Sequence, residues 1–144
     1  MNILFICTGN TCRSPMAAAI MNKIAEENDM DVKASSAGIF AEVGMGASEN
    51  AVKAMRLYGI SLKGHKSTQL TEKMIEEADL VFTMTEGQRL MIEGYAPEKI
   101  FSVYEFLSSE GDIADPYGGD LDEYNETAQE IYDALVDIAE SLVE

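Results

Sequence analysis

Cys7 and Arg13 stand six positions apart near the start of the chain, and together they could carry out nucleophilic chemistry on an anion. The five residues between them are mostly small or polar. The guanidinium of arginine is a planar fork of N–H groups that binds two phosphate oxygens at once. Cysteine thiols beside cationic groups or helix N-termini commonly have pKa values within roughly 3.5–7.5. We therefore predict that Cys7 is a thiolate at neutral pH and attacks a phosphorus atom held by Arg13.

The flanking segments predict that this motif joins a strand to a helix. Residues 2–7 are apolar almost throughout, as in a central parallel strand. Ser14 suits the N-cap of a helix and Pro15 suits its first position, so a helix is expected over residues 15–28. The loop of residues 7–14, which we call the cysteine–arginine loop, would point backbone N–H groups at a bound phosphate or other oxyanion. The loop residues expected to contact the substrate are Thr8, Gly9, Asn10, Thr11, Cys12 and Ser14.

A second interpretation of the motif is purely structural. Cys7 could be a buried cysteine in a Rossmann-like turn, with Arg13 in a surface salt bridge. A cysteine and an arginine at this spacing can occur by chance, whereas the whole string CTGNTCRS directly after a strand is far more specific. Phosphate chemistry is therefore the preferred interpretation.

Hydrophobic periodicity predicts strands and helices that alternate along the rest of the chain. The expected strands are residues 31–35, 79–84 and 99–103, and the expected helices are residues 48–58, 71–78, 86–94 and 120–142. Gly59 is the expected C-cap of the helix over residues 48–58. This alternation predicts an α/β fold, a single Rossmann-like domain over residues 1–144 in which helices cover both faces of a parallel sheet.

Composition and charge restrict the partners of the protein. Apolar residues make up 47% of the 144 residues, which is usual for a globular domain, and the formal net charge is −16. Such an acidic surface disfavours nucleic acid and anionic membranes as partners. Of the 26 acidic residues, 13 lie in residues 100–144, which contain no Lys or Arg. We interpret this segment as a solvated helix face, and a preference for basic segments of protein substrates is the weaker alternative.

The sequence predicts neither a cofactor nor a metal site. The chain has only two cysteines, Cys7 and Cys12, and His65 is the only histidine, so a histidine-based metal cluster is excluded. Two cysteines are also too few for a disulfide scaffold. Because the chain shows no signal peptide and no apolar stretch of membrane-spanning length, a cytoplasmic protein is expected.

The string CTGNTCRSP of residues 7–15 resembles the signature of the low-molecular-weight protein tyrosine phosphatase family, and most closely its branch that acts on phosphoarginine in proteins. The similarity continues through SAG at residues 36–38, HKS at 65–67 and DP at 115–116. The resemblance implies a four-stranded sheet in the order 2-1-3-4, with the site at the C-terminal end of the first strand. It also implies a metal-independent hydrolase, expected to be a monomer, that forms a phosphocysteine intermediate on phosphorylated protein substrates.

The resemblance assigns roles to residues outside the loop as well. Asp115 would be the general acid that protonates the leaving group and the base that then activates water. Tyr117 would form an aromatic wall of the pocket. Ser36 would brace the cysteine–arginine loop, and His65 would support that loop through a hydrogen bond to Asn10.

Two further assignments follow from the same resemblance. Ser14 would stabilise the Cys7 thiolate when it leaves in the second step. Phe40 would line the pocket, although its position is equally compatible with a core aromatic.

Cys12 is the second cysteine of the loop, and the curl of the chain is expected to bring it near Cys7. The two would then be close enough for a disulfide once Cys7 is oxidised to a sulfenic acid. The alternative is that Cys12 is a small buried residue that only fills space.

Thr11 favours phosphoarginine as the substrate, because its hydroxyl can meet the N–H groups of a guanidinium. Tyrosine-directed relatives usually have an apolar residue there. Arginine-directed members often carry phenylalanine where this chain has Tyr117, which keeps phosphotyrosine open as the alternative substrate. A non-catalytic reader of phosphoproteins is a third possibility, whereas thioredoxin-linked arsenate reductases of related fold use further downstream cysteines that this chain lacks.

Overall fold

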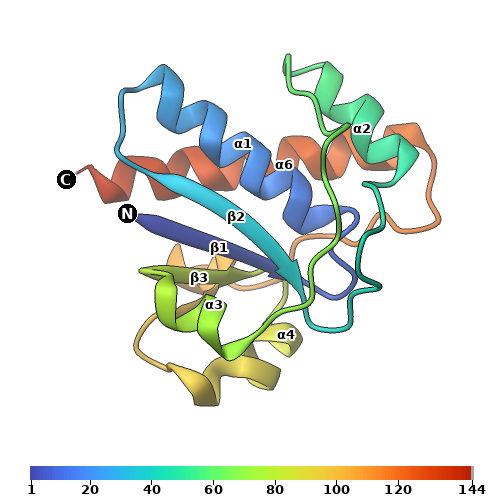
Figure 1. Cartoon of the computed structure of the whole chain (residues 1–144). Coiled ribbons are helices and arrows are strands. Elements are labelled where there is room, and N and C mark those ends of the chain that lie inside the picture. Colours follow the sequence, from blue (N-terminus) through green and yellow to red (C-terminus); the bar gives the residue numbers. More distant parts are fainter. Residues whose placement is uncertain (144) are drawn as a thin grey trace.

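A four-stranded parallel sheet forms the centre of the molecule, in the order β2-β1-β3-β4 (Figure 1). The strands are β1 (Asn2–Cys7), β2 (Lys33–Gly38), β3 (Leu80–Thr83) and β4 (Ile100–Ser102). The computed structural model describes residues 1–143. It confirms the expected α/β fold and the expected strand order.

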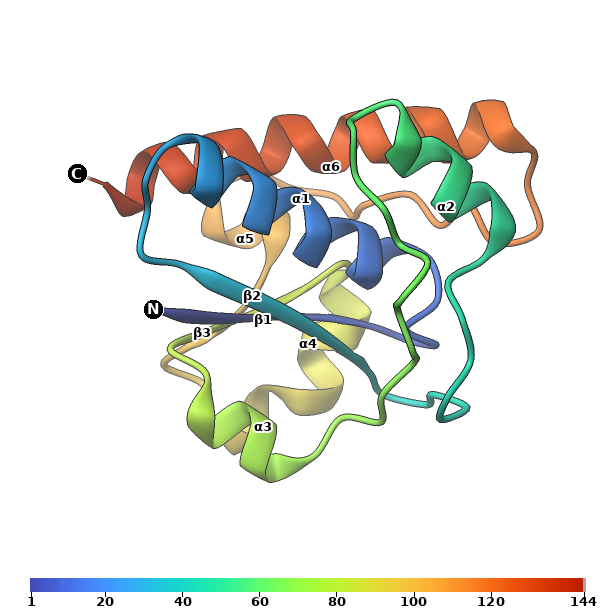
Figure 2. The same cartoon turned by 45° about the horizontal axis from the view of Figure 1, so that its top comes forward.

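Helices cover both faces of this sheet (Figure 2). The larger core lies under α1 (Arg13–Glu27), α2 (Glu49–Arg56), α5 (Val103–Phe106) and α6 (Leu121–Leu142). The smaller core lies on the other face, under α3 (Glu72–Glu77) and α4 (Glu86–Ile92), and the short 3-10 helix η1 (Glu93–Tyr95) follows α4. The central strand β1 serves both cores, because side chains alternate across a strand: Ile3 and Phe5 enter the larger core, and Leu4 and Ile6 enter the smaller one.

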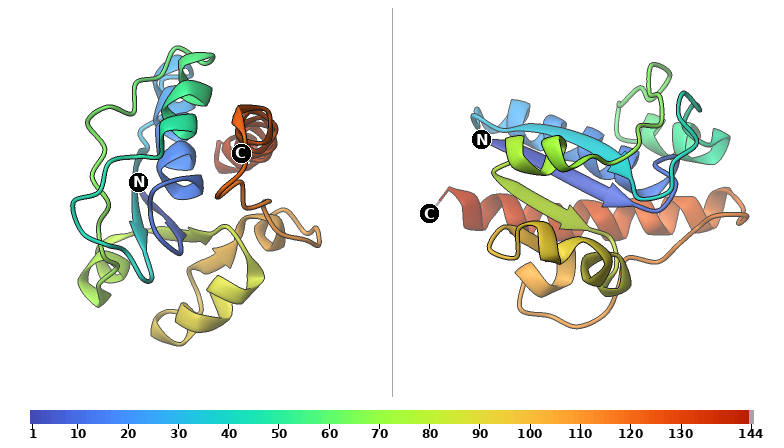
Figure 3. Two further views of the ribbon diagram at one scale, coloured as in Figure 1. Left: turned by 90° about the vertical axis from the view of Figure 1, so that its right-hand side faces the viewer. Right: turned by 60° about the horizontal axis from the view of Figure 1, so that its bottom comes forward.

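The larger core is built from aromatic rings and the apolar face of α6. Phe5 stacks on Phe82 with ring centroids 5.7 Å apart, and Phe106 meets Phe82 edge-on at 5.0 Å. One face of α6 is apolar and packs into this core, where Leu135 and Ile138 are fully buried. Helix α6 lies alongside α1, as both views in Figure 3 show. No helix within residues 1–143 combines the length and the apolar character needed to cross a bilayer.

The start of α1 differs from the prediction. The helix begins at Arg13, and Cys12 occupies the N-cap position without a side-chain hydrogen bond. Ser14 is therefore not the N-cap, because its hydroxyl lies 2.8 Å from Cys7 Sγ inside the cysteine–arginine loop. Pro15 becomes the third residue of the helix, where its missing N–H is still one that the helix leaves unpaired.

The end of one strand and the end of one helix also depart from the predicted bounds. The strand expected over residues 99–103 ends at Ser102, whose side chain caps the unpredicted helix α5 through a capping box with Glu105. Helix α2 ends at Arg56, earlier than predicted. Gly59 nevertheless follows the helix in the conformation expected of a terminating glycine, because its φ of 71° favours glycine. The backbone N–H of the next residue, Ile60, donates to Met55 O at 3.0 Å, as at the end of many helices.

Gly38 ends β2 beside the cysteine–arginine loop, and its register partner in β1 is Cys7. The position has no room for a side chain. A Cβ atom there would lie 2.6 Å from the carbonyl oxygen of Thr8 and 3.0 Å from the amide nitrogen of Asn10. Glycine at this position therefore lets β2 pack directly against the backbone of the loop.

Gly38→Ala should destabilise the protein by roughly 1–3 kcal/mol, the usual effect of overpacking, because the added methyl group collides with the backbone rather than with a movable side chain. The free energy of unfolding in urea measures the loss. Gly46→Ala is the matched control, since nothing lies within 4 Å of its Cβ position. Equal stability of the two variants would show that the loop moves aside without loss.

Candidate active site

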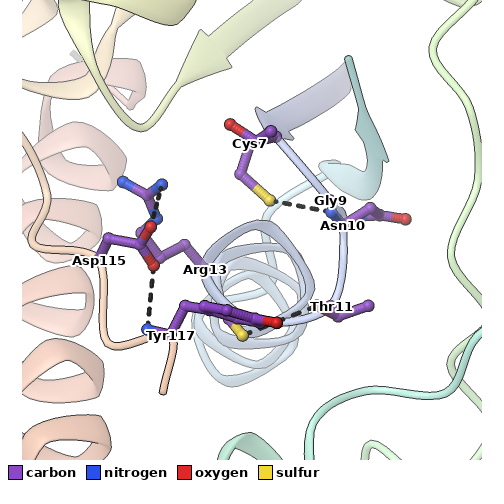
Figure 4. A pocket seen from close by; sticks show the side chains of 9 residues that line it. Cys7, Gly9, Asn10, Thr11, Arg13, Asp115 and Tyr117 are labelled. Carbon is purple, nitrogen blue, oxygen red and sulfur yellow. Dashed lines mark hydrogen bonds and ion pairs between the residues drawn. The ribbon is translucent and has the colours of Figure 1, made fainter. Parts of the chain in front are cut away.

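The cysteine–arginine loop curls around a cavity of about 290 Å³ at the C-terminal end of β1 (Figure 4). The loop forms one wall, and the segment after α5 supplies the facing wall. Nine residues line the cavity: Cys7, Thr8, Gly9, Asn10, Thr11, Cys12, Arg13, Asp115 and Tyr117. All nine belong to the set that the sequence predicted for the site.

Two groups within the loop point hydrogen atoms at the sulfur of Cys7. The side chain of Cys7 is buried, and the backbone N–H of Asn10 donates to Sγ at 3.3 Å. The hydroxyl oxygen of Ser14 lies 2.8 Å from the same sulfur, below the cavity. Because a thiolate has no proton to give, the Ser14 hydroxyl is the donor whenever Cys7 is ionised. Both groups can therefore donate a hydrogen bond to the sulfur when it is the attacking thiolate.

Asn10 holds the loop in its curled shape. Its φ of 59° lies in the left-handed region, and the residue is fully buried. The side-chain amide donates to Ser14 Oγ and to Ser36 Oγ, both at 2.9 Å. The side-chain oxygen accepts the backbone N–H of Thr68 at 2.9 Å. Both N–H groups and the oxygen of this amide therefore have partners, and the loop is tied to β2 and to the segment before Leu70.

His65 adds a second support to the same residue. Its Nε2 lies 2.7 Å from the backbone oxygen of Asn10. Since a carbonyl oxygen only accepts, Nε2 carries the proton in this contact. The predicted contact of His65 with Asn10 is present, and so is that of Ser36. Thr68 was not predicted, because it contributes only its backbone N–H, a group that nearly every residue has and that the sequence therefore does not reveal.

Arg13 is a buried cation held by two contacts from the opposite wall. Its Nη1 donates to the backbone oxygen of Ile113 at 3.0 Å, and its Nη2 lies 3.5 Å from Asp115 Oδ2. The carboxylate of Asp115 is half exposed, and its Oδ1 accepts the backbone N–H of Tyr117 at 3.1 Å. These contacts hold the guanidinium of Arg13 beside the carboxylate of Asp115 in the wall of the cavity (Figure 4).

Cys12, which also lines the cavity, belongs to a second hydrogen-bond network. Its Sγ donates to Ser48 Oγ at 3.5 Å and lies 3.2 Å from the hydroxyl of Tyr124. The pKa of Tyr124 is raised to about 12, mainly by burial and to a smaller extent by the hydrogen bond with Cys12. Tyr124 therefore keeps its proton at neutral pH and can donate it to the sulfur. The sequence predicted no site role for Ser48 or Tyr124, which fall within the expected helices of residues 48–58 and 120–142.

Two predicted site residues lie away from the cavity wall. Phe40 is 69% exposed and is not among the lining residues. The alternative that Phe40 is a core aromatic is therefore also wrong. The backbone N–H of Phe40 donates to Thr8 O at 2.9 Å. Ser14 lies beneath Cys7 and reaches the sulfur rather than the cavity.

Within residues 1–143, no three His, Cys, Asp or Glu side chains converge as metal ligands.

Comparison with known proteins gives one consistent family. Residues 2–144 match the family described as low molecular weight phosphotyrosine protein phosphatase. The chain is 42% identical to a protein-arginine-phosphatase of Bacillus subtilis, with 99% of this chain and 97% of that protein aligned. It is 33% identical to the low molecular weight protein-tyrosine-phosphatase PtpB of Staphylococcus aureus, with 94% of this chain and 95% of that protein aligned.

Solved structures give the same result. One is the YwlE arginine phosphatase, a C7S mutant with a phosphorylated active site serine, which is 40% identical with a TM-score of 0.97 and covers 100% of this chain and 97% of its own. Another is Wzb of Vibrio vulnificus in complex with benzylphosphonate, which is 28% identical with a TM-score of 0.87 and covers 97% of each chain.

Proposed function

Because the chain belongs to the low molecular weight phosphotyrosine protein phosphatase family, we propose that it hydrolyses phosphoarginine in proteins through a phosphocysteine intermediate. The observation that carries the proposal is the cavity itself, which Cys7, Arg13 and Asp115 line together, with the guanidinium of Arg13 3.5 Å from the carboxylate of Asp115. Similarity to two proteins named protein-arginine-phosphatase supports the choice of substrate.

In the first step, the Cys7 thiolate attacks phosphorus, and the bond from phosphorus to the guanidine nitrogen of the substrate breaks. Asp115 gives its proton to the departing nitrogen, so that neutral or protonated arginine leaves rather than an anion. Arg13 and the backbone N–H groups of the loop stabilise the charge that develops on the phosphoryl oxygens. The contact between Arg13 and Ile113 O supports this role, since a guanidinium already held in place needs little reorganisation.

In the second step, Asp115 accepts a proton from water, and the resulting hydroxide attacks the phosphorus of the phosphocysteine. The sulfur–phosphorus bond breaks and the thiolate of Cys7 is restored. The Ser14 hydroxyl, 2.8 Å from that sulfur, donates a hydrogen bond as negative charge returns to it. Inorganic phosphate is the second product.

Thr11 supports phosphoarginine because it lines the cavity and carries a hydroxyl that can accept a guanidinium N–H. Phosphotyrosine is the second candidate substrate, and the position of Tyr117 favours it. Tyr117 is 80% exposed yet lines the cavity, so its ring can pack against the ring of a phosphotyrosine. Rates on phosphoarginine and phosphotyrosine peptides, measured on one preparation, discriminate between them.

Cys7→Ser should abolish turnover of p-nitrophenyl phosphate, and Asp115→Asn should lower kcat by about 10²–10⁴-fold, the usual contribution of general acid catalysis. Asp122→Asn, on the exposed first turn of α6, is the charge-matched control and should leave kcat unchanged. Near-normal activity of Cys7→Ser would rule out the covalent mechanism, whereas no turnover by the unaltered protein would leave phosphate binding without catalysis as the function.

Peroxide should inactivate the enzyme reversibly through Cys12. Peroxide converts the Cys7 thiolate to a sulfenic acid, and the Cys12 thiol then displaces water from it to form a disulfide. Dithiothreitol should restore activity by reducing that disulfide. Cys12→Ser should recover far less, because the sulfenic acid is then oxidised further. Equal recovery by both proteins would leave Cys12 without a redox role.

Thr11→Ile should lower kcat/KM for phosphoarginine by roughly ten- to a hundredfold, because a guanidinium N–H loses its acceptor in a narrow site. Activity on phosphotyrosine should stay level or rise, since its ring gains an apolar contact. Thr11→Ser keeps the hydroxyl and should keep the phosphoarginine preference. A parallel fall in both activities would mean that Thr11 only shapes the loop.

A further inference from the structure

Gln88, on the first turn of α4, makes a hydrogen bond to the cavity wall from outside the cysteine–arginine loop. Its side chain is buried, and its Nε2 donates to the hydroxyl oxygen of Thr8 at 3.1 Å. Thr8 is exposed and lines the cavity. The two residues are 80 positions apart in the chain and meet only because β1 and β3 are neighbours in the sheet.

The orientation of the Gln88 amide is fixed by its other partners. Its Oε1 accepts the backbone N–H groups of Met84 and Thr85, both at 3.1 Å. Its own backbone N–H donates to Thr85 Oγ1 at 3.1 Å, which completes the capping box of α4. An amide turned the other way would set its NH₂ group against two N–H donors. The NH₂ group of Gln88 therefore faces Thr8.

This orientation determines what the Thr8 hydroxyl can do. Its oxygen accepts from Gln88, so its own hydrogen has to point in another direction. Among residues 1–143, no protein acceptor takes that hydrogen, and the open side of Thr8 is the cavity. A phosphoryl oxygen is an acceptor without hydrogen atoms, so a hydroxyl held in this way is complementary to it.

We propose that the side-chain hydroxyl of Thr8 donates a hydrogen bond to a phosphoryl oxygen of the substrate, and that Gln88 is the positioning residue that orients it as a donor. The proposal rests on the proposed function only in that the cavity holds a phosphoryl group. Thr8 thus adds a side-chain donor to the backbone N–H groups and the guanidinium of Arg13. Gln88 acts through Thr8 and does not itself line the cavity.

Gln88→Glu tests the orientation with almost no change of shape. One carboxylate oxygen can still accept from Met84 and Thr85, so the start of α4 is kept. The other oxygen has no hydrogen to give and instead accepts from Thr8, which turns the hydroxyl hydrogen away from the cavity. Two quantities are measured with inorganic phosphate: its inhibition constant against p-nitrophenyl phosphate, and its dissociation constant by calorimetry.

Thr8→Val and Gln88→Glu should each weaken phosphate binding by about tenfold, as for a lost hydrogen bond to a charged group. Thr8→Ser should recover most of the affinity lost in Thr8→Val. In the double variant Thr8→Val with Gln88→Glu, the loss should be close to that of either single variant, because both remove the same interaction. Gln129→Glu, an exposed glutamine on α6, controls for one added negative charge and should leave phosphate binding unchanged.

Losses that multiply in the double variant would overturn the positioning role, because the added charge would then act without Thr8. Wild-type phosphate affinity in Thr8→Val would overturn the role of the hydroxyl, and this variant does not disturb the capping box of α4. Calorimetry needs no turnover. An enzyme inactive on every phosphoamino acid that still binds phosphate through Thr8 would therefore refute the proposed function and leave this inference standing.

Discussion

Asn10 holds the centre of the site in a backbone conformation that residues with a Cβ rarely adopt, at a φ of 59°. Left-handed backbone costs roughly 1–2 kcal/mol outside glycine, so it persists only where surrounding contacts compensate. Here the side chain donates hydrogen bonds to Ser14 and Ser36 and accepts one from the backbone N–H of Thr68. His65 donates to the backbone oxygen. An amide suits this position because it donates twice and accepts once. The cavity has its shape because Asn10 is held on every side.

The other contacts of the site come from segments that follow the strands of the sheet. Gly38 ends β2 and lets the loop backbone approach closely. Gln88 follows β3 and orients Thr8, and the segment after β4 and α5 supplies the carbonyl of Ile113 that aims Arg13. Parallel strands end at one edge of a sheet, and this is why segments far apart in sequence meet around one anion site. The buried guanidinium of Arg13 provides positive charge at the site, although the protein as a whole has a net charge of −16.

Long periodic segments could be predicted from the sequence, and short or strained ones could not. The apolar run of β1 and the stripe of α6 identify their elements, because burial imposes a regular spacing over many residues. Helix α5 has four residues, too few for any periodicity. The start of α1 was placed wrongly because Ser14 is a good N-cap by type. In the structure, the Ser14 hydroxyl forms hydrogen bonds with Cys7 and Asn10 instead of capping the helix.

The sequence by itself determined that Cys7 and Arg13 share one cavity, since they lie within one short loop whose spacing holds them together. It also identified Asp115 and Tyr117 through the family resemblance. Only the tertiary structure decided how these groups are oriented: Gln88 against Thr8, and Tyr124 against Cys12, 112 positions away. It also turned Phe40 out to solvent. Such contacts leave no local pattern, because they depend on how distant strands and helices pack against each other.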